Sequence, residues 1–153
     1  MATGNEHDIK VLNGLIETTL DSADGYRQAA KDTKNDGFVS LFNQRADERQ
    51  RVAGELQNEV RKLGGTPEDD GTVLAAAHRV FLNLKNMVTS GDQAIVDTVE
   101  DGEDHIKAKY EDALKDEDVT PATQQAITRA YESVRAGHDQ MRDLKHSMHG
   151  RTS

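Results

Sequence analysis

Apolar side chains recur every three or four positions along the chain, and this helical period restricts its fold more than any other feature. The period is interrupted by polar breaks, two of which hold the only prolines, Pro67 and Pro121. Charged residues make up 31% of the chain, a proportion that also occurs in disordered proteins. The regular period between the breaks nevertheless indicates a folded, all-α protein.

Five helices are predicted, within a single domain that spans residues 1–153. They cover residues about 5–31, 38–63, 72–88, 92–115 and 121–147, followed by a tail at 148–153. Short breaks separate the first helix from the second and the fourth from the fifth, so each pair is expected to form an antiparallel hairpin. The shorter third helix is expected to cross from one hairpin to the other. This order is that of a ferritin-like four-helix bundle, which is the predicted fold.

Residues at and within the predicted helices add local detail. Asn5 is expected to cap the first helix, and Gly64-Gly65 is expected to end the second. Single glycines inside helices, such as Gly54 and Gly137, cost helical stability. We interpret them as points where two helices, or two subunits, approach closely.

Composition excludes several classes of function. The net charge of −9 argues against a nucleic-acid partner, because such binders concentrate Lys and Arg. The absence of Cys excludes disulfides, thiolate metal sites and Cys nucleophiles. No apolar run approaches the roughly 18 residues that span a membrane, and no secretory signal is visible, so a cytoplasmic protein is expected. Known catalytic and phosphate-binding motifs are missing from the sequence, which predicts no catalytic and no cofactor-binding residue.

Three stretches resemble the hairpin helices of ferritin-like proteins, namely residues 15–26, 42–53 and 103–110. Over residues 5–147 the chain more closely resembles a family of small bacterial ferritin-like bundles described only as a domain of unknown function. This resemblance implies a bacterial, stress-associated protein. It implies no activity, because none is established for the family.

Ferritin-like di-metal proteins bind their metals with Glu from two helices and Glu-x-x-His from the other two, all facing inward. Rotation by about 100° per residue identifies the residues at those six positions of this chain. They are Thr19, Arg49, Val52, Glu103, His138 and Met141. Only one carboxylate and one imidazole remain, and a guanidinium does not suit a dinuclear iron or manganese site. The sequence therefore predicts that no metal or other cofactor is bound.

The inward arginines suggest a polar network in place of the metals. A buried Arg49, together with Arg45, requires a charged partner, and Glu103 is the available inward carboxylate. We expect a network of Arg49, Glu103 and His138 that fixes the register of the helices. Further hydrogen bonds are expected from the hydroxyls of Thr19, Tyr26, Tyr110 and Tyr131. In the alternative interpretation, the arginine head groups extend to solvent at the edge of the apolar face.

Three functions follow from these interpretations. The favoured one is a non-catalytic bundle that acts through assembly or protein contacts, including contacts between copies of itself, with no nucleic-acid or membrane partner. The second is an iron-oxidising or storage protein that binds iron or manganese at a rearranged site with Glu103 and His138, supplemented by Glu48 or Glu100. The third is a small-ligand site in the bundle core, between Tyr26 and Tyr110.

Overall fold

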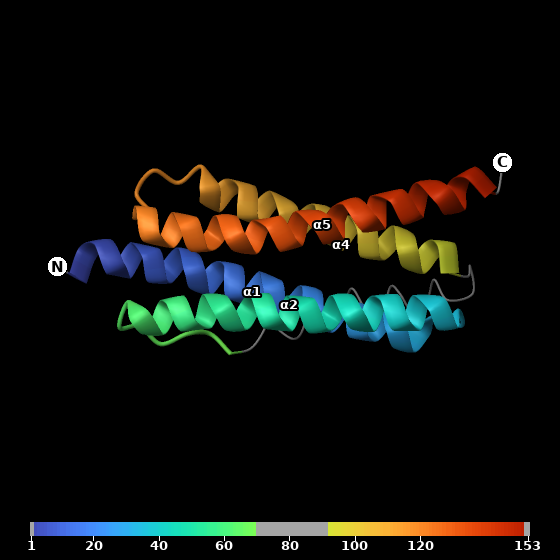
Figure 1. Cartoon of the computed structure of the whole chain (residues 1–153), viewed down its shortest axis with the longest axis horizontal. Helices are drawn as coiled ribbons and strands as arrows, with labels where there is room; N and C mark the ends of the chain where they lie inside the picture. The colour runs from blue at the N-terminus through green and yellow to red at the C-terminus, as the bar shows by residue number, and fades with distance from the viewer. Residues whose placement is uncertain (1, 70–91, 152–153) are drawn as a thin grey trace.

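The computed structural model describes residues 2–69 and 92–151, and within these stretches it contains helices and loops but no strand. Four helices are present there (Figure 1). They are α1 (Ala2–Asp32), α2 (Asp36–Lys62), α4 (Asp92–Leu114) and α5 (Pro121–Arg151). The crossover helix predicted at 72–88 lies outside the described residues. None of the described helices carries a stretch long and apolar enough to cross a membrane.

The four helices pack as two antiparallel hairpins placed side by side (Figure 1). Helix α1 pairs with α2 and α4 pairs with α5, while α1 also contacts α4 and α2 also contacts α5. Helix α2 ends at one end of the bundle and α4 begins at the opposite end, so these two helices run in the same direction (Figure 1). The four described helices therefore confirm the prediction of an all-α helical bundle.

Helices α1 and α5 are longer than predicted, whereas α5 begins at Pro121 as predicted. Helix α1 begins before Asn5, whose side chain donates a hydrogen bond to the Leu63 carbonyl at 3.4 Å instead of capping α1. Helix α5 continues to Arg151, so residues 148–151 are helical rather than part of the expected tail. The start of α5 is held by Asp8 of α1, which accepts hydrogen bonds from the Thr120 amide at 3.1 Å and the Thr120 hydroxyl at 2.5 Å.

The end of α2 is set by its two glycines, as the sequence predicts. Gly64 has a φ of 84°, a left-handed conformation that glycine adopts without a steric cost. The Gly64 amide donates to the Arg61 carbonyl and the Gly65 amide donates to the Val60 carbonyl, each at 3.0 Å. These two bonds form a Schellman motif, which satisfies carbonyls that the end of the helix would otherwise leave unpaired.

The core consists of two apolar clusters with a polar layer between them. One cluster surrounds Ile16, Leu56, Ile106 and Ile127, and the other contains Phe42, Ile95 and Met141. On α2, Arg49 stands between Ala46 of one cluster and Val52 of the other. On α4, Glu103 likewise stands between Val96 and Ile106. The helical period therefore brings both charged residues to the same level of the bundle.

Candidate functional site

Arg49 and Glu103 form a buried ion pair in the middle of the bundle. The Arg49 Nη2 atom lies 2.8 Å from Glu103 Oε2, and the two side chains are 0% and 1% exposed. Arg49 Nη1 donates to the Ser22 hydroxyl at 2.8 Å, and Nη2 also donates to the Val134 carbonyl at 3.3 Å. Thus Arg49 of α2 touches all three other described helices. Its Nε–H has no hydrogen-bond partner among the described residues.

Tyr26 completes the surroundings of the pair. Its hydroxyl donates to Glu103 Oε1 at 2.7 Å, and its ring centroid lies 5.7 Å from Arg49 Cζ, within range of a cation–π contact. Burial and the negative charge of Glu103 hold the pKa of Tyr26 well above its usual value. Burial alone would lower the pKa of Arg49, but the charge and hydrogen bond of Glu103, together with Tyr26 and Tyr110, raise that pKa overall. Both oxygens of Glu103 are therefore engaged by donors that remain protonated.

Gly137 allows α5 to approach this pair. A Cβ atom at position 137 would lie 2.4 Å from Arg49 Nη2, closer than any real contact. The expected close approach between helices therefore occurs at Gly137. At Gly54, by contrast, a Cβ atom would meet no other described residue within 4 Å.

The remaining aromatic and hydroxyl residues form a second group, nearer the end of the bundle. The Thr19 hydroxyl donates to the Leu15 carbonyl at 2.6 Å, so Tyr110 is the donor in the 2.7 Å bond between the two hydroxyls. Burial raises the pKa of Tyr110 to about 12. Tyr110 stacks on Tyr131, whose hydroxyl donates to Glu111 at 2.8 Å. These hydrogen bonds do not reach Arg49 or Glu103.

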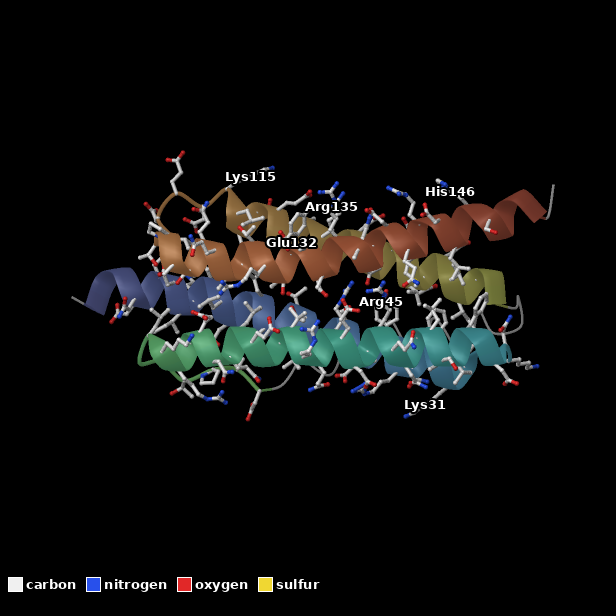
Figure 2. The ribbon with its side chains drawn as sticks, in the orientation of Figure 1. Lys31, Arg45, Lys115, Glu132, Arg135 and His146 are labelled. Atoms are coloured by element: carbon white, nitrogen blue, oxygen red, sulfur yellow. The ribbon has the colours of Figure 1, made fainter. Side chains whose placement is uncertain are left out.

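Arg45 lies at the boundary between α2 and α5 rather than in the buried pair (Figure 2). Its Nε donates to Gln140 at 2.7 Å and its Nη1 donates to Glu48 at 2.8 Å. Glu48 also accepts a hydrogen bond from the Ser133 hydroxyl. The inclusion of Arg45 in the central network is therefore corrected, because its helix position turns it to the edge of the apolar face, where polar side chains of α5 are within reach.

His138 also has other partners than those expected. Its Nε2 lies 2.6 Å from Asp104 Oδ1 and its Nδ1 lies 3.4 Å from Asp139 Oδ1, and the hydrogen bond with His138 lowers the pKa of Asp139. The expected network of Arg49, Glu103 and His138 is therefore corrected to a pair without His138. The guanidinium fills the space beside Gly137, and the neighbouring imidazole turns to the outer side of α4.

Near His138, a second carboxylate approaches from α4. Glu100 is 8% exposed and accepts a 3.3 Å hydrogen bond from Lys145. A group of three possible metal ligands lies here, with one ligating atom from each residue within 4.8 Å of the other two: Glu100, Asp104 and His138. Among the residues that sequence reasoning missed, Asp104 had a usable signal, because it follows Glu100 by four positions and so shares its helix face. Ser22 of α1 had a similar signal, because it precedes Tyr26 by four positions and so shares its helix face.

The sequence matches one family model over residues 7–116, that of the Domain of unknown function DUF2383. The chain belongs to the DUF2383 family. No curated protein matches this DUF2383 sequence. The matched range includes both charged residues of the central pair, Arg49 and Glu103, together with Glu100 and Asp104. It ends before α5, so Gly137 and His138 lie beyond the part that the DUF2383 model describes.

Proposed function

We propose that this DUF2383 chain is a ferritin-like bundle without a dinuclear metal centre and that it acts through contacts with other proteins. The ferritin-like assignment is supported by the two antiparallel hairpins and by the common direction of α2 and α4. It agrees with the hairpin segments that resemble ferritin-like helices in the sequence.

The observation that carries the proposal is the burial of Arg49 where a metal ligand would be needed. Its guanidinium has donors but no lone pair to offer, and it lies 2.8 Å from the buried carboxylate of Glu103. The positive charge of this guanidinium would repel a divalent cation. The other ligand position on α2 is occupied by Val52, which is 1% exposed and packs in the apolar core. The residues present therefore do not fit a dinuclear iron or manganese centre.

The contacts of Glu103 and of the tyrosines also argue against the two alternative uses of the core. Glu103 is engaged by Arg49 and Tyr26, and His138 is engaged by Asp104, so a metal site that combines Glu103 with His138 gains no support. The hydroxyls of Tyr26 and Tyr110 are likewise paired, which leaves neither free for a small ligand between them. We explain the polar core as a set of hydrogen bonds and one ion pair that fix the packing of the helices.

Because its core serves the packing of the helices, a bundle of this kind would act through its surface. The net charge is −9, and α4 exposes acidic residues that include Asp101 and Asp112. A protein partner with a basic surface would be attracted to such a bundle, with an association rate that falls as salt is added. This charge favours another, basic protein over a second copy, because a second copy carries the same net charge of −9. A molar mass above 16.9 kDa in light scattering would assign the contact to copies of the chain, and a mass of 16.9 kDa would assign it to another protein.

The absence of ferritin-like chemistry is tested by aerobic oxidation of Fe²⁺, followed by absorbance. We expect the wild-type protein to oxidise Fe²⁺ no faster than buffer does. The Glu103→Gln variant serves as the matched control, because it removes the carboxylate that pairs with Arg49. Oxidation that exceeds the buffer rate and is lost in Glu103→Gln would contradict the proposal.

A further inference from the structure

We propose that Glu100, Asp104 and His138 form a mononuclear site for a divalent transition-metal cation between α4 and α5. One oxygen from each carboxylate and one imidazole nitrogen already lie within 4.8 Å of one another. The site shares no residue with the central pair of Arg49 and Glu103 and goes beyond the proposed function, which concerns the centre of the bundle.

The two helices present the ligands from opposite sides. Glu100 and Asp104 are four residues apart, so both project from one face of α4. His138 comes from α5, with its Nε2 2.6 Å from Asp104 Oδ1. Zinc lies about 2.0–2.2 Å from imidazole nitrogens and carboxylate oxygens, and two ligands of a tetrahedral ion are then roughly 3.4 Å apart.

Asp139 orients the imidazole for this role. Its Oδ1 lies 3.4 Å from His138 Nδ1, so it accepts the proton of the tautomer that carries hydrogen on Nδ1. In that tautomer the lone pair of Nε2 points toward Asp104 and Glu100. A carboxylate behind a metal-binding histidine is the common arrangement in metal sites, because it fixes the ring and increases the basicity of the ligand.

Charge, access and burial suit a cation of this class. The two carboxylates balance a charge of +2, and a set of three nitrogen and oxygen ligands leaves positions open for water. Glu100 and His138 are buried, whereas the Asp104 side chain is 58% exposed and offers a route from solvent. The ligand set contains no thiolate, and it therefore suits Zn²⁺, Fe²⁺ or Mn²⁺.

Lys145 competes with the metal for Glu100. Its Nζ lies 3.3 Å from Glu100 Oε2, and the hydrogen bond with this carboxylate raises the pKa of Lys145. The Lys145 side chain is 31% exposed and has room to turn into solvent when a cation takes its place. Removal of the ammonium group should therefore strengthen metal binding, whereas removal of a ligand should weaken it.

The test is calorimetric titration of the full chain with Zn²⁺. We expect the wild type to bind one Zn²⁺ per chain. Binding should be weakened by more than about tenfold in Asp104→Asn and in His138→Gln, which each lose a ligand. It should be weakened by about tenfold in Asp139→Asn, which loses the carboxylate behind the imidazole. Lys145→Ala should bind Zn²⁺ more tightly than the wild type. The matched control is Asp112→Asn, which removes the same charge from an exposed position of the same helix and should leave the affinity unchanged.

A second grouping provides the decisive comparison. His7, Asp116 and Asp118 also bring their ligating atoms within 4.8 Å of one another, at the end of the bundle. Unchanged binding in Asp104→Asn and His138→Gln, or loss of binding in His7→Asn, would overturn the proposal. Broadening of amide NMR signals by Mn²⁺ locates the ion independently, and we expect it around residues 100, 104 and 138. Zn²⁺ binding that depends on Glu103 instead would contradict both this proposal and the proposed function, whereas no binding would contradict this one alone.

Discussion

At the scale of single residues, the energetics of Arg49 depend on its one charged partner. Taking a guanidinium and a carboxylate out of water costs several kcal/mol for each ion, and their attraction offsets this cost only if hydrogen bonds complete the geometry. Arg49 has such bonds at both Nη atoms, but the buried Nε–H finds no partner in the part of the chain that the structure describes. An unpaired buried donor costs about 1–3 kcal/mol. The pair therefore adds little net stability, although breaking it is expensive.

We accordingly predict that Glu103→Ala lowers the free energy of unfolding by about 3–5 kcal/mol, because it leaves a buried guanidinium uncompensated. The double variant Arg49→Met/Glu103→Leu should be far milder, since the desolvation cost disappears together with the charges. Chemical denaturation of the wild type, Arg49→Met, Glu103→Leu and the double variant Arg49→Met/Glu103→Leu gives the coupling energy between positions 49 and 103.

The exposed pair of Arg51 and Glu55 on the same helix is the control. Its atoms are 3.1 Å apart, but the side chains are 64% and 54% exposed. A cycle at positions 51 and 55 should give a coupling energy of about 0.3–0.5 kcal/mol, as is usual for exposed pairs on a helix. If positions 49 and 103 are also additive within about 0.5 kcal/mol, the central pair does not have the energetic role assigned to it.

Sequence reasoning can reach the face of a helix but not the partner of a side chain. The helical period placed Arg49 and Glu103 on apolar faces, and the structure brings their charged groups together. The same period could not say that His138 would meet Asp104, since this depends on how far α5 is shifted along α4. Arg45 lies at the edge of its face, where a small helix rotation decides between the core and the boundary with α5.

At the scale of helices, the glycines differ in what they permit. Gly137 makes room for the Arg49 guanidinium, whereas a Cβ atom added at Gly54 would be more than 4 Å from its nearest neighbours in the described parts of the chain. We predict that Gly137→Ala lowers Tm, since the added methyl group displaces Arg49 from Glu103 and overpacking of this kind costs about 1–3 kcal/mol. Gly54→Ala should raise Tm, because alanine favours an α-helix over glycine by about 1 kcal/mol. Thermal unfolding followed by circular dichroism measures both effects, and a stabilising Gly137→Ala would refute the close contact.

The helix ends show why local patterns predict element boundaries incompletely. The Gly64-Gly65 ending was predictable because a Schellman motif uses only residues near one another in sequence. The start of α5 at Pro121 was predictable in the same way, but the contact of Thr120 with Asp8 was not, because the two residues are 112 positions apart. Asn5 is a good cap by residue type, yet α1 begins before it and its amide contacts Leu63. A contact between segments far apart in the sequence cannot be recognised from the local sequence pattern.

At the scale of the whole molecule, the polar layer limits how the helices can be arranged. Apolar side chains that recur every three or four residues would still be buried if one helix slid along another by a turn. Such a slip would separate Arg49 from Glu103 and leave both charges unpaired in the core, where they are 0% and 1% exposed. The two apolar clusters on either side supply stability for several registers, and the ion pair between them selects one.

This selection can be separated from stability in the variant Arg49→Met/Glu103→Leu. The variant removes the cost of a slipped register while it keeps the apolar faces, so we predict full helicity but more than one packing arrangement. In a ¹H–¹⁵N NMR spectrum, we expect broadened or doubled amide signals for residues near positions 22, 49, 103 and 134, where the wild type gives one signal each. Arg51→Met/Glu55→Leu is the matched control, because it removes an ion pair from the surface of α2 and should leave the spectrum single. A single sharp set of signals from Arg49→Met/Glu103→Leu would mean that the shape of the apolar core alone determines the register, as a well-packed core is able to do.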